Sequence, residues 1–133
     1  MKQVACPIAL HPDGAPARIP LFDHPTAGYQ LVDGVLKPDE HPEAAAARAL
    51  YNVSGLETRA TLYIGDNADI QAQAQWHFTL CRIAPPIREK WQHFCKEDGG
   101  QLLRFHWHPL DAPLPDDTNE VCHAALAWIR KTL

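Results

Sequence analysis

One stretch decides the fold of this 133-residue chain: GVLKPDEHPEAAAARALYNVSGL, residues 34–56. Its second half predicts a helix over residues 41–53. Pro42 suits the first helical position, where its missing N–H costs nothing. The alanines that follow have the best intrinsic helix propensity, and Gly55 is a common helix stop. We therefore expect a loop that starts at Gly34, followed by a helix that Gly55 ends.

The spacing of this stretch resembles the Nudix box. That signature reads Gly, five residues, Glu, seven residues, Arg-Glu, an apolar residue, any residue, Glu-Glu, any residue, Gly and an apolar residue. Segments 23–34, 91–94, 98–100 and 105–110 also resemble parts of Nudix domains outside the box. The positions of the box in register are Gly34, Glu40, Arg48, Leu50, Gly55 and Leu56.

This resemblance implies an α+β fold, the Nudix-type α/β/α sandwich. A mixed central sheet would lie between the box helix and a C-terminal helix. We expect one domain over residues 1–133. The order of predicted elements, strands, helix, strands, helix, is compatible with that class.

The chain departs from the signature at its chemical centre. The family has Glu at positions 49, 52 and 53, where this chain has Ala49, Asn52 and Val53. On a helix these positions share one face. In the family their carboxylates gather Mg²⁺ or Mn²⁺ on a substrate diphosphate, because hard cations need oxygen ligands. Alanine and valine cannot ligate a metal, so we expect no metal cofactor, and Mg or Mn only if the chain is active.

Two charged box positions are retained. By resemblance, Glu40 helps to organise the loop near the metal site, although an exposed loop acid is an equal interpretation. Arg48 would orient the loop or pair with an acid. Glu40 and Asn52 are the remaining candidate metal ligands. The candidate ligand-binding residues are Tyr29, Gln30 and Gly34, and the first two would serve a pocket or a core equally well.

Outside the box, hydrophobic patterning predicts further strands. Segments 3–10 and 17–22 are expected to form a hairpin, and segments 57–64 and 72–83 two more strands. In the last of these, Trp76, Phe78 and Leu80 alternate with other residues, which predicts one apolar face. We favour a hairpin of 88–96 with 101–108 over a helix. A terminal helix is expected, capped by Asp117 with Glu120 at its third position.

Composition narrows the partners. The net charge is −4, and no run of Lys and Arg occurs. Nucleic acid and anionic membranes are therefore not expected partners. No secretory signal is recognisable, which predicts a cytoplasmic protein. The cysteines form no CxxC pair and are expected to be buried free thiols; they are Cys6, Cys81, Cys95 and Cys122. The sequence leaves the oligomeric state open, and an oligomer is possible.

The sequence leaves three candidate functions open. The first is a Nudix-type domain that binds a nucleotide-like or phosphate-bearing small molecule with weak or no hydrolysis. The second is an active pyrophosphohydrolase of nucleoside diphosphate-linked substrates, with a rearranged Mg or Mn site. The third is a protein-interaction scaffold. The joint loss of the three glutamates favours the first over the second, while the first and the third are left open.

Overall fold

The computed structural model describes residues 1–14 and 16–133, except for the side chain of Asp98. Two four-stranded sheets and two α-helices form its framework within these residues. In chain order the elements are β1 (Lys2–Ala9), β2 (Arg18–His24), β3 (Gly28–Gln30), β4 (Gly34–Val35), α1 (Pro42–Ser54), β5 (Thr58–Asn67), β6 (Ala74–Ile83), β7 (Lys90–Cys95), the 3₁₀ turn η1 (Glu97–Gly99), β8 (Gln101–Pro109) and α2 (Glu120–Thr132).

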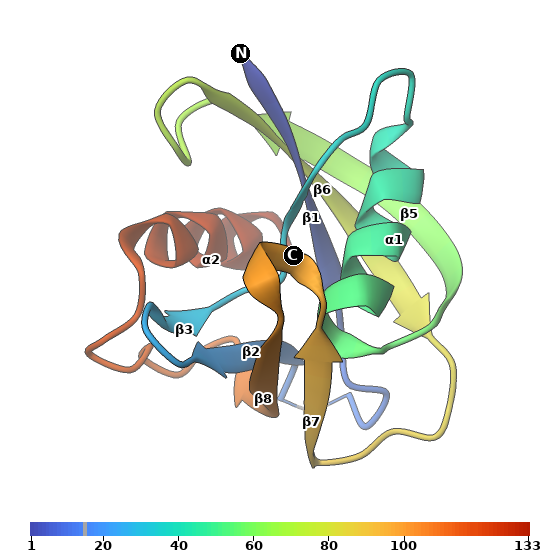
Figure 1. Ribbon diagram of the computed structural model, residues 1–133, viewed down its shortest axis with the longest axis vertical. Helices are drawn as coiled ribbons and strands as arrows, with labels where there is room; N and C mark the ends of the chain where they lie inside the picture. The colour runs from blue at the N-terminus through green and yellow to red at the C-terminus, as the bar shows by residue number, and fades with distance from the viewer. Residues whose placement is uncertain (15) are drawn as a thin grey trace.

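The first sheet has the strand order β4-β1-β6-β5. It is mixed, because β1 runs parallel to β6 while β4 and β5 are antiparallel to their neighbours. The second sheet has the order β3-β2-β8-β7 and is antiparallel throughout. Figure 1 shows α1 and α2 on opposite sides of β1 and β6.

The side chains of β1 show why two helices are needed. Ala5 and Ala9 pack in one buried cluster with α1, and Val4, Cys6 and Ile8 pack in a second cluster with α2. Alternate residues of a strand point to opposite faces, so β1 is buried on both sides. This arrangement confirms the expected α+β sandwich, with its strands divided between two sheets.

The predicted box helix is confirmed as α1. Gly55 ends it in a left-handed conformation with φ 78°, and its N–H donates to Tyr51 O at 2.8 Å. A Cβ at Gly55 would lie 2.8 Å from Nδ1 of His93, so glycine is also needed for space. The indole N–H of Trp91 donates to Ser54 O at 2.8 Å. The end of α1 is thereby fixed against β7.

The hairpin predicted for segments 3–10 and 17–22 is wrong. Both strands form, but β1 pairs with β4 and β6, whereas β2 pairs with β3 and β8. The turn between them keeps a backbone bond from His11 N–H to Arg18 O at 3.0 Å. β1 is apolar on both faces, and such strands are accommodated in sheets that have helices on both sides. Here β4 and β6 occupy the two edges of β1, so β2 pairs elsewhere.

Two local expectations also need correction. The cap of α2 is Asn119, whose side chain accepts from Val121 N–H at 2.8 Å, and Glu120 is the first helical residue. Asp117 is unsuited because its backbone carbonyl packs against Gly28. On β6, Thr79 and Cys81 are buried, because this strand too has both faces covered. Of the predicted apolar residues, Trp76 and Phe78 are buried and Leu80 is only partly buried. Its burial therefore does not follow a single apolar face.

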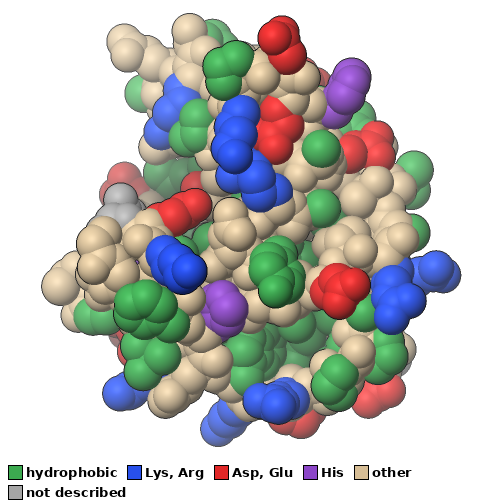
Figure 2. Space-filling view, turned by 45° about the vertical axis from the view of Figure 1, so that its right-hand side comes forward, with side chains coloured by type: hydrophobic (Ala, Val, Ile, Leu, Met, Phe, Trp, Pro, Cys, Tyr) green, Lys and Arg blue, Asp and Glu red, His purple; other side chains and the backbone are tan. Residues whose placement is uncertain are grey.

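Other expectations hold. Segment 88–96 forms β7, which pairs with β8 as the favoured hairpin. All four cysteines are free and buried. Neither helix of the described chain is long and apolar enough to cross a membrane. On the face shown in Figure 2, basic and acidic side chains are interspersed rather than gathered by sign.

Candidate functional site

An ion pair connects the loop between β4 and α1 to the helix that follows it. Arg48 donates from Nε to Glu40 Oε2 at 2.9 Å and from Nη2 to Glu40 Oε1 at 2.8 Å. The same Nη2 donates to Val35 O at 2.9 Å, and the N–H of Lys37 donates to Glu40 Oε1 at 2.9 Å. The hydrogen bond from Arg48, and then that from Lys37, lower the pKa of Glu40 to about 2. Glu40 and Arg48 therefore act on the loop, and neither lines the pocket described below.

The start of the box is packed directly onto its helix. A Cβ built on Gly34 would lie 2.8 Å from the Cβ of Ala49, a separation that real side chains do not tolerate. Ala49 is accordingly buried, with 3% of its surface exposed. The contact needs a residue without a side chain at position 34 and leaves little room around position 49.

The face of α1 that carries metal ligands in Nudix boxes offers no carboxylate here. Ala49 and Val53 are buried and have no donor atom, and Asn52 is exposed. Across the part of the chain that is described, no group of three or more His, Cys, Asp or Glu side chains is arranged to hold a metal ion. Divalent cations such as Mg²⁺ require several oxygen ligands. The residues present at the box positions therefore do not fit the family's metal.

A pocket of about 310 Å³ opens beside Val53, between the end of α1, the second sheet and η1. We call it the acidic pocket, because its charged lining residues are Asp33 and Glu97. Its volume lies at the lower end of the range of small-molecule sites, roughly 300–1,000 Å³. Its lining residues are Phe22, His24, Gln30, Leu31, Asp33, Gly34, Val35, Val53, Cys95, Glu97, Gln101 and Leu103.

A smaller hollow of about 150 Å³ lies on the α2 side of the same segment. It shares Gln30, Leu31 and Asp33 with the acidic pocket and adds Lys2 and Asn119 to its lining. We call it the flanking hollow. Asp33 thus stands between two concave sites of different charge.

Asp33 has the most perturbed carboxyl group of the pocket. Its side chain is exposed to solvent in the concave surface, yet protein surrounds it closely. This desolvation raises its pKa to about 6, against an ordinary value of 3.8, while Lys2 lowers it and Glu97 raises it further. Perturbed acids in clefts are frequent at functional sites. The charge of this pocket therefore changes between weakly acidic and neutral pH.

His24 brings a donor to the acidic pocket. Its Nδ1 accepts the backbone N–H groups of Thr26 at 3.1 Å and Ala27 at 3.2 Å. In a neutral imidazole the other nitrogen then carries the proton. His24 therefore offers Nε2–H for hydrogen bonding, where Asp33 and Glu97 offer acceptors.

The predicted ligand-binding residues separate in the structure. Gln30 and Gly34 line the acidic pocket, but Tyr29 does not. Tyr29 lines an open basin with Arg104 and His106, and its ring meets His106 edge-on at 5.8 Å. Neighbouring strand residues point to opposite faces of a sheet, which agrees with Tyr29 and Gln30 of β3 lining different concave sites.

Several pocket residues were not singled out from the sequence. Asp33 and Glu97 are among them. His24 and Gln101 carried no signal at all. The turn η1 brings Glu97 to the pocket, and only the pairing of β7 with β8 places that turn.

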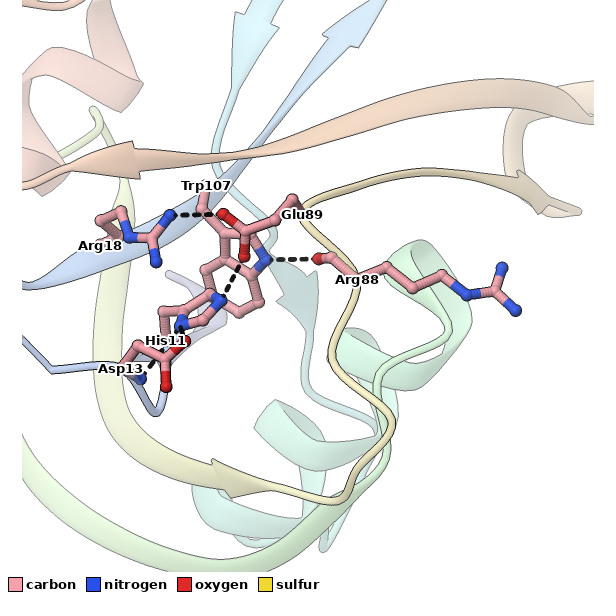
Figure 3. A network of polar contacts seen from close by, with 6 residues as sticks. All are labelled: His11, Asp13, Arg18, Arg88, Glu89 and Trp107. Carbon is pink, nitrogen blue, oxygen red and sulfur yellow. Dashed lines mark hydrogen bonds and ion pairs between the residues drawn. The ribbon is translucent and has the colours of Figure 1, made fainter.

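A polar network elsewhere has an active-site appearance but a structural role (Figure 3). Buried His11 donates from Nε2 to Glu89 Oε2 at 2.7 Å, because its Nδ1 accepts the N–H of Asp13 at 3.1 Å. Glu89 also receives Arg18 Nη1 at 2.8 Å, and the His11 ring packs edge-on against Trp107 at 4.8 Å. Both imidazole nitrogens of His11 therefore have partners within the chain, and the network joins the turn after β1 to the segment before β7.

Comparison with known proteins identifies the fold. No protein-family model matches the chain, and no curated protein matches its sequence. It is similar to a Chromobacterium violaceum structure assigned to the nudix hydrolase family, with a TM-score of 0.68 and 20% identity over 98% of this chain and 78% of that one. It is also similar to an ADP-ribose pyrophosphatase of Streptococcus suis 89-1591, with a TM-score of 0.64 and 16% identity over 97% of this chain and 92% of that one.

A MutT structure, from work on Aliivibrio salmonicida and Vibrio cholerae, gives a TM-score of 0.61 and 14% identity over 96% of this chain and 98% of that one. At such identities the likeness establishes the fold alone. The architecture of this chain is that of the Nudix hydrolases, as the box spacing predicted.

Proposed function

We propose that this chain is a Nudix-type domain that binds a nucleotide-like small molecule in the acidic pocket and hydrolyses it weakly or not at all. The observation that carries the proposal is the pair Ala49 and Val53. Both lie on the helix face where the family gathers its metal, and neither has a ligating atom. A bound metal supplies several kcal/mol of transition-state stabilisation, and each ~1.4 kcal/mol is a factor of ten in rate.

Binding is favoured over a purely structural scaffold by the character of the pocket. It lies beside the box helix and combines acids, amides and an imidazole with apolar walls from Phe22 and Leu103. Sites for small molecules typically combine apolar walls with a few placed polar groups. A scaffold alone has no need of such a lining.

The alternative is a hydrolase with a rearranged metal site. Asp33 and Glu97 are the acids that could take part, since both line the pocket and Glu97 affects the pKa of Asp33. Within the described side chains they are the two carboxylates of the pocket, and Val53, at the end of α1, adds none. The observations therefore favour ligand binding over this alternative.

The test separates binding from turnover. The full chain is titrated calorimetrically with nucleosides, nucleotides and nucleoside diphosphate derivatives, and phosphate release is measured with Mg²⁺ or Mn²⁺ present. We expect saturable binding with no metal-dependent turnover. Metal-dependent rates in the ordinary enzymatic range of roughly 1–10³ s⁻¹ would overturn the proposal in favour of the rearranged hydrolase. Absence of binding to the whole panel would favour the scaffold.

A further inference from the structure

The acidic pocket has an unusual charge for a nucleotide site. Asp33 and Glu97 line it, and no Lys or Arg does so within the described residues. Lys2 lines the flanking hollow on the other side of Asp33, and its charge acts on Asp33 from there. A phosphate group in the acidic pocket would face two carboxylates and no basic side chain among the described lining residues.

Its remaining polar groups are suited to a nitrogen heterocycle. When ionised, the carboxylates of Asp33 and Glu97 accept hydrogen bonds and donate none. The amides of Gln30 and Gln101 both donate and accept. His24 adds the Nε2–H donor established by its two backbone contacts. The apolar walls, Phe22 and Leu103 among them, can cover the faces of a planar ring.

We infer, on the basis of the function proposed above, that the acidic pocket receives the nitrogen-rich ring of the ligand and that phosphate lies outside it. The ring is neutral or cationic and carries adjacent N–H donors, as a guanine-type base or an arylamidine does. A carboxylate can accept two such donors at once, and charge-assisted bonds of this kind are the stronger ones. Like charges repel in a confined site, where water screens them less than in bulk.

This assignment reverses the use that a metal-loaded Nudix site makes of the region beside the box helix. A divalent cation there attracts a diphosphate. With Val53 in place of a carboxylate, Asp33 and Glu97 instead present acceptors to the ligand, and no Lys or Arg of the described lining stands among them. The part of the ligand that donates hydrogen bonds is therefore the part that enters.

The test uses the ¹⁵N-labelled full chain in EDTA, titrated with guanosine, GDP and benzamidine. The side-chain amide signals of Gln30 and Gln101 report on the acidic pocket. The test variant is D33N/E97Q, which removes its acids. The matched control is D69N/E57Q, which changes the net charge equally at residues that line neither the pocket nor the flanking hollow.

We expect guanosine, GDP and benzamidine each to shift both amide signals in wild type and control alike, because the phosphates of GDP lie outside the pocket. In D33N/E97Q the affinity for each probe should fall at least about tenfold. GDP that binds without shifting either amide signal, or that binds D33N/E97Q as tightly as wild type, would overturn this inference while leaving the proposed function standing. Acid-dependent benzamidine binding without guanosine or GDP binding would overturn the proposed function and retain the charge preference. No shift with any probe would overturn both.

Discussion

Arg48 and Glu40 meet through two hydrogen bonds, with Nε 2.9 Å from Oε2 and Nη2 2.8 Å from Oε1. The pair joins the middle of α1 to the loop that precedes it. Because Arg48 also reaches Val35 O, it fixes both ends of that loop at once. In this structure the two charged residues at the box positions therefore connect the loop to α1.

Replacing Glu40 by Gln should lower the free energy of unfolding by about 1 kcal/mol at pH 7, a value reduced for solvent screening of a partly exposed pair. The folded-state pKa of Glu40 lies at about 2, below its ordinary value of 4.5. A lowered pKa stabilises the fold above the ordinary value, and this stabilisation is lost as the pH falls through about 2. Urea unfolding of wild type and E40Q should therefore differ at pH 7 and converge near pH 2.

The control for this pair is R48K, which keeps the charge but loses the two-point geometry. It should be less stable than wild type at pH 7 and should retain part of the pH dependence. If E40Q and wild type unfold at the same urea concentration at pH 7, the pair does not stabilise the loop.

Asp33 should give the opposite pH dependence. Its folded-state pKa of about 6 lies above the ordinary 3.8, so its ionisation opposes folding. The associated stability is fully present below about pH 4 and is lost as the pH rises through 6. D33N should therefore match wild type at pH 4 and exceed its unfolding free energy by about 1 kcal/mol at pH 8, after discounting for the exposure of the side chain.

Unfolding by urea across pH 4–8 measures this difference between D33N and wild type. A constant difference over that range would mean that protein does not desolvate Asp33 in the folded state. D69N is a suitable reference, because Asp69 is exposed and lines neither the acidic pocket nor the flanking hollow.

The His11 network allows its two halves to be compared. E89A removes the acceptor of the buried His11 Nε2–H and should lower the stability, because a buried donor without a partner is unfavourable. R18Q removes only the ion pair at the exposed end of Glu89 and should lower the stability less, because solvent screens such pairs. Chemical unfolding at neutral pH compares the two variants directly. A larger loss for R18Q than for E89A would show that the ion pair, and not the buried hydrogen bond, stabilises this network.

A carboxylate at position 53 should create metal affinity. Val53 lines the acidic pocket with Asp33 and Glu97, so V53E adds a third carboxylate to two that are present. We expect Mn²⁺ binding at least about tenfold tighter than in wild type, with a dissociation constant in the range of roughly 10⁻⁴–10⁻³ M that modest oxygen sites reach. Electron paramagnetic resonance of free Mn²⁺ measures it.

The control is V53Q, which has a similar shape without the charge and should leave Mn²⁺ affinity unchanged. Both variants place a polar group at a buried position and should lose about 1–3 kcal/mol of stability. If V53E gains no affinity over V53Q, the side chain at position 53 does not approach Asp33 and Glu97 as the pocket geometry indicates.

The sequence predicted the elements that depend on local spacing and missed those that depend on distant contacts. Pro42, the alanines and Gly55 specify α1 within one segment, so its bounds were predicted within one residue. The cap of α2 was predicted at the wrong residue, because Asp and Asn are both good caps and the sequence offers Asp117 as well as Asn119. The contact of Asp117 with Gly28 decides between them.

The acidic pocket illustrates the same limit at the candidate site. Gln30 and Gly34, two of the three candidate ligand-binding residues, line this pocket, although the sequence left Gln30 open between a pocket and a core. Glu97 reaches the pocket only through the hairpin of β7 and β8, which lies much later in the chain, at residues 90–109. No periodicity in the sequence relates such positions. Strand alternation, by contrast, could have shown that Tyr29 and Gln30 point to opposite faces.

The final prediction concerns the contact of Gly34 with Ala49. G34A places a Cβ 2.8 Å from that of Ala49, so α1 must shift or the two backbones must separate. Forced overpacking of this kind costs about 1–3 kcal/mol. When position 49 is also glycine, the methyl group added at position 34 has room. Glycine within a helix itself costs about 1 kcal/mol. The double variant G34A/A49G should therefore lose less stability than the sum of the two single variants, by at least about 1 kcal/mol. A double-mutant cycle from urea unfolding measures this coupling, and strictly additive losses would show that β4 and α1 do not meet at these two residues.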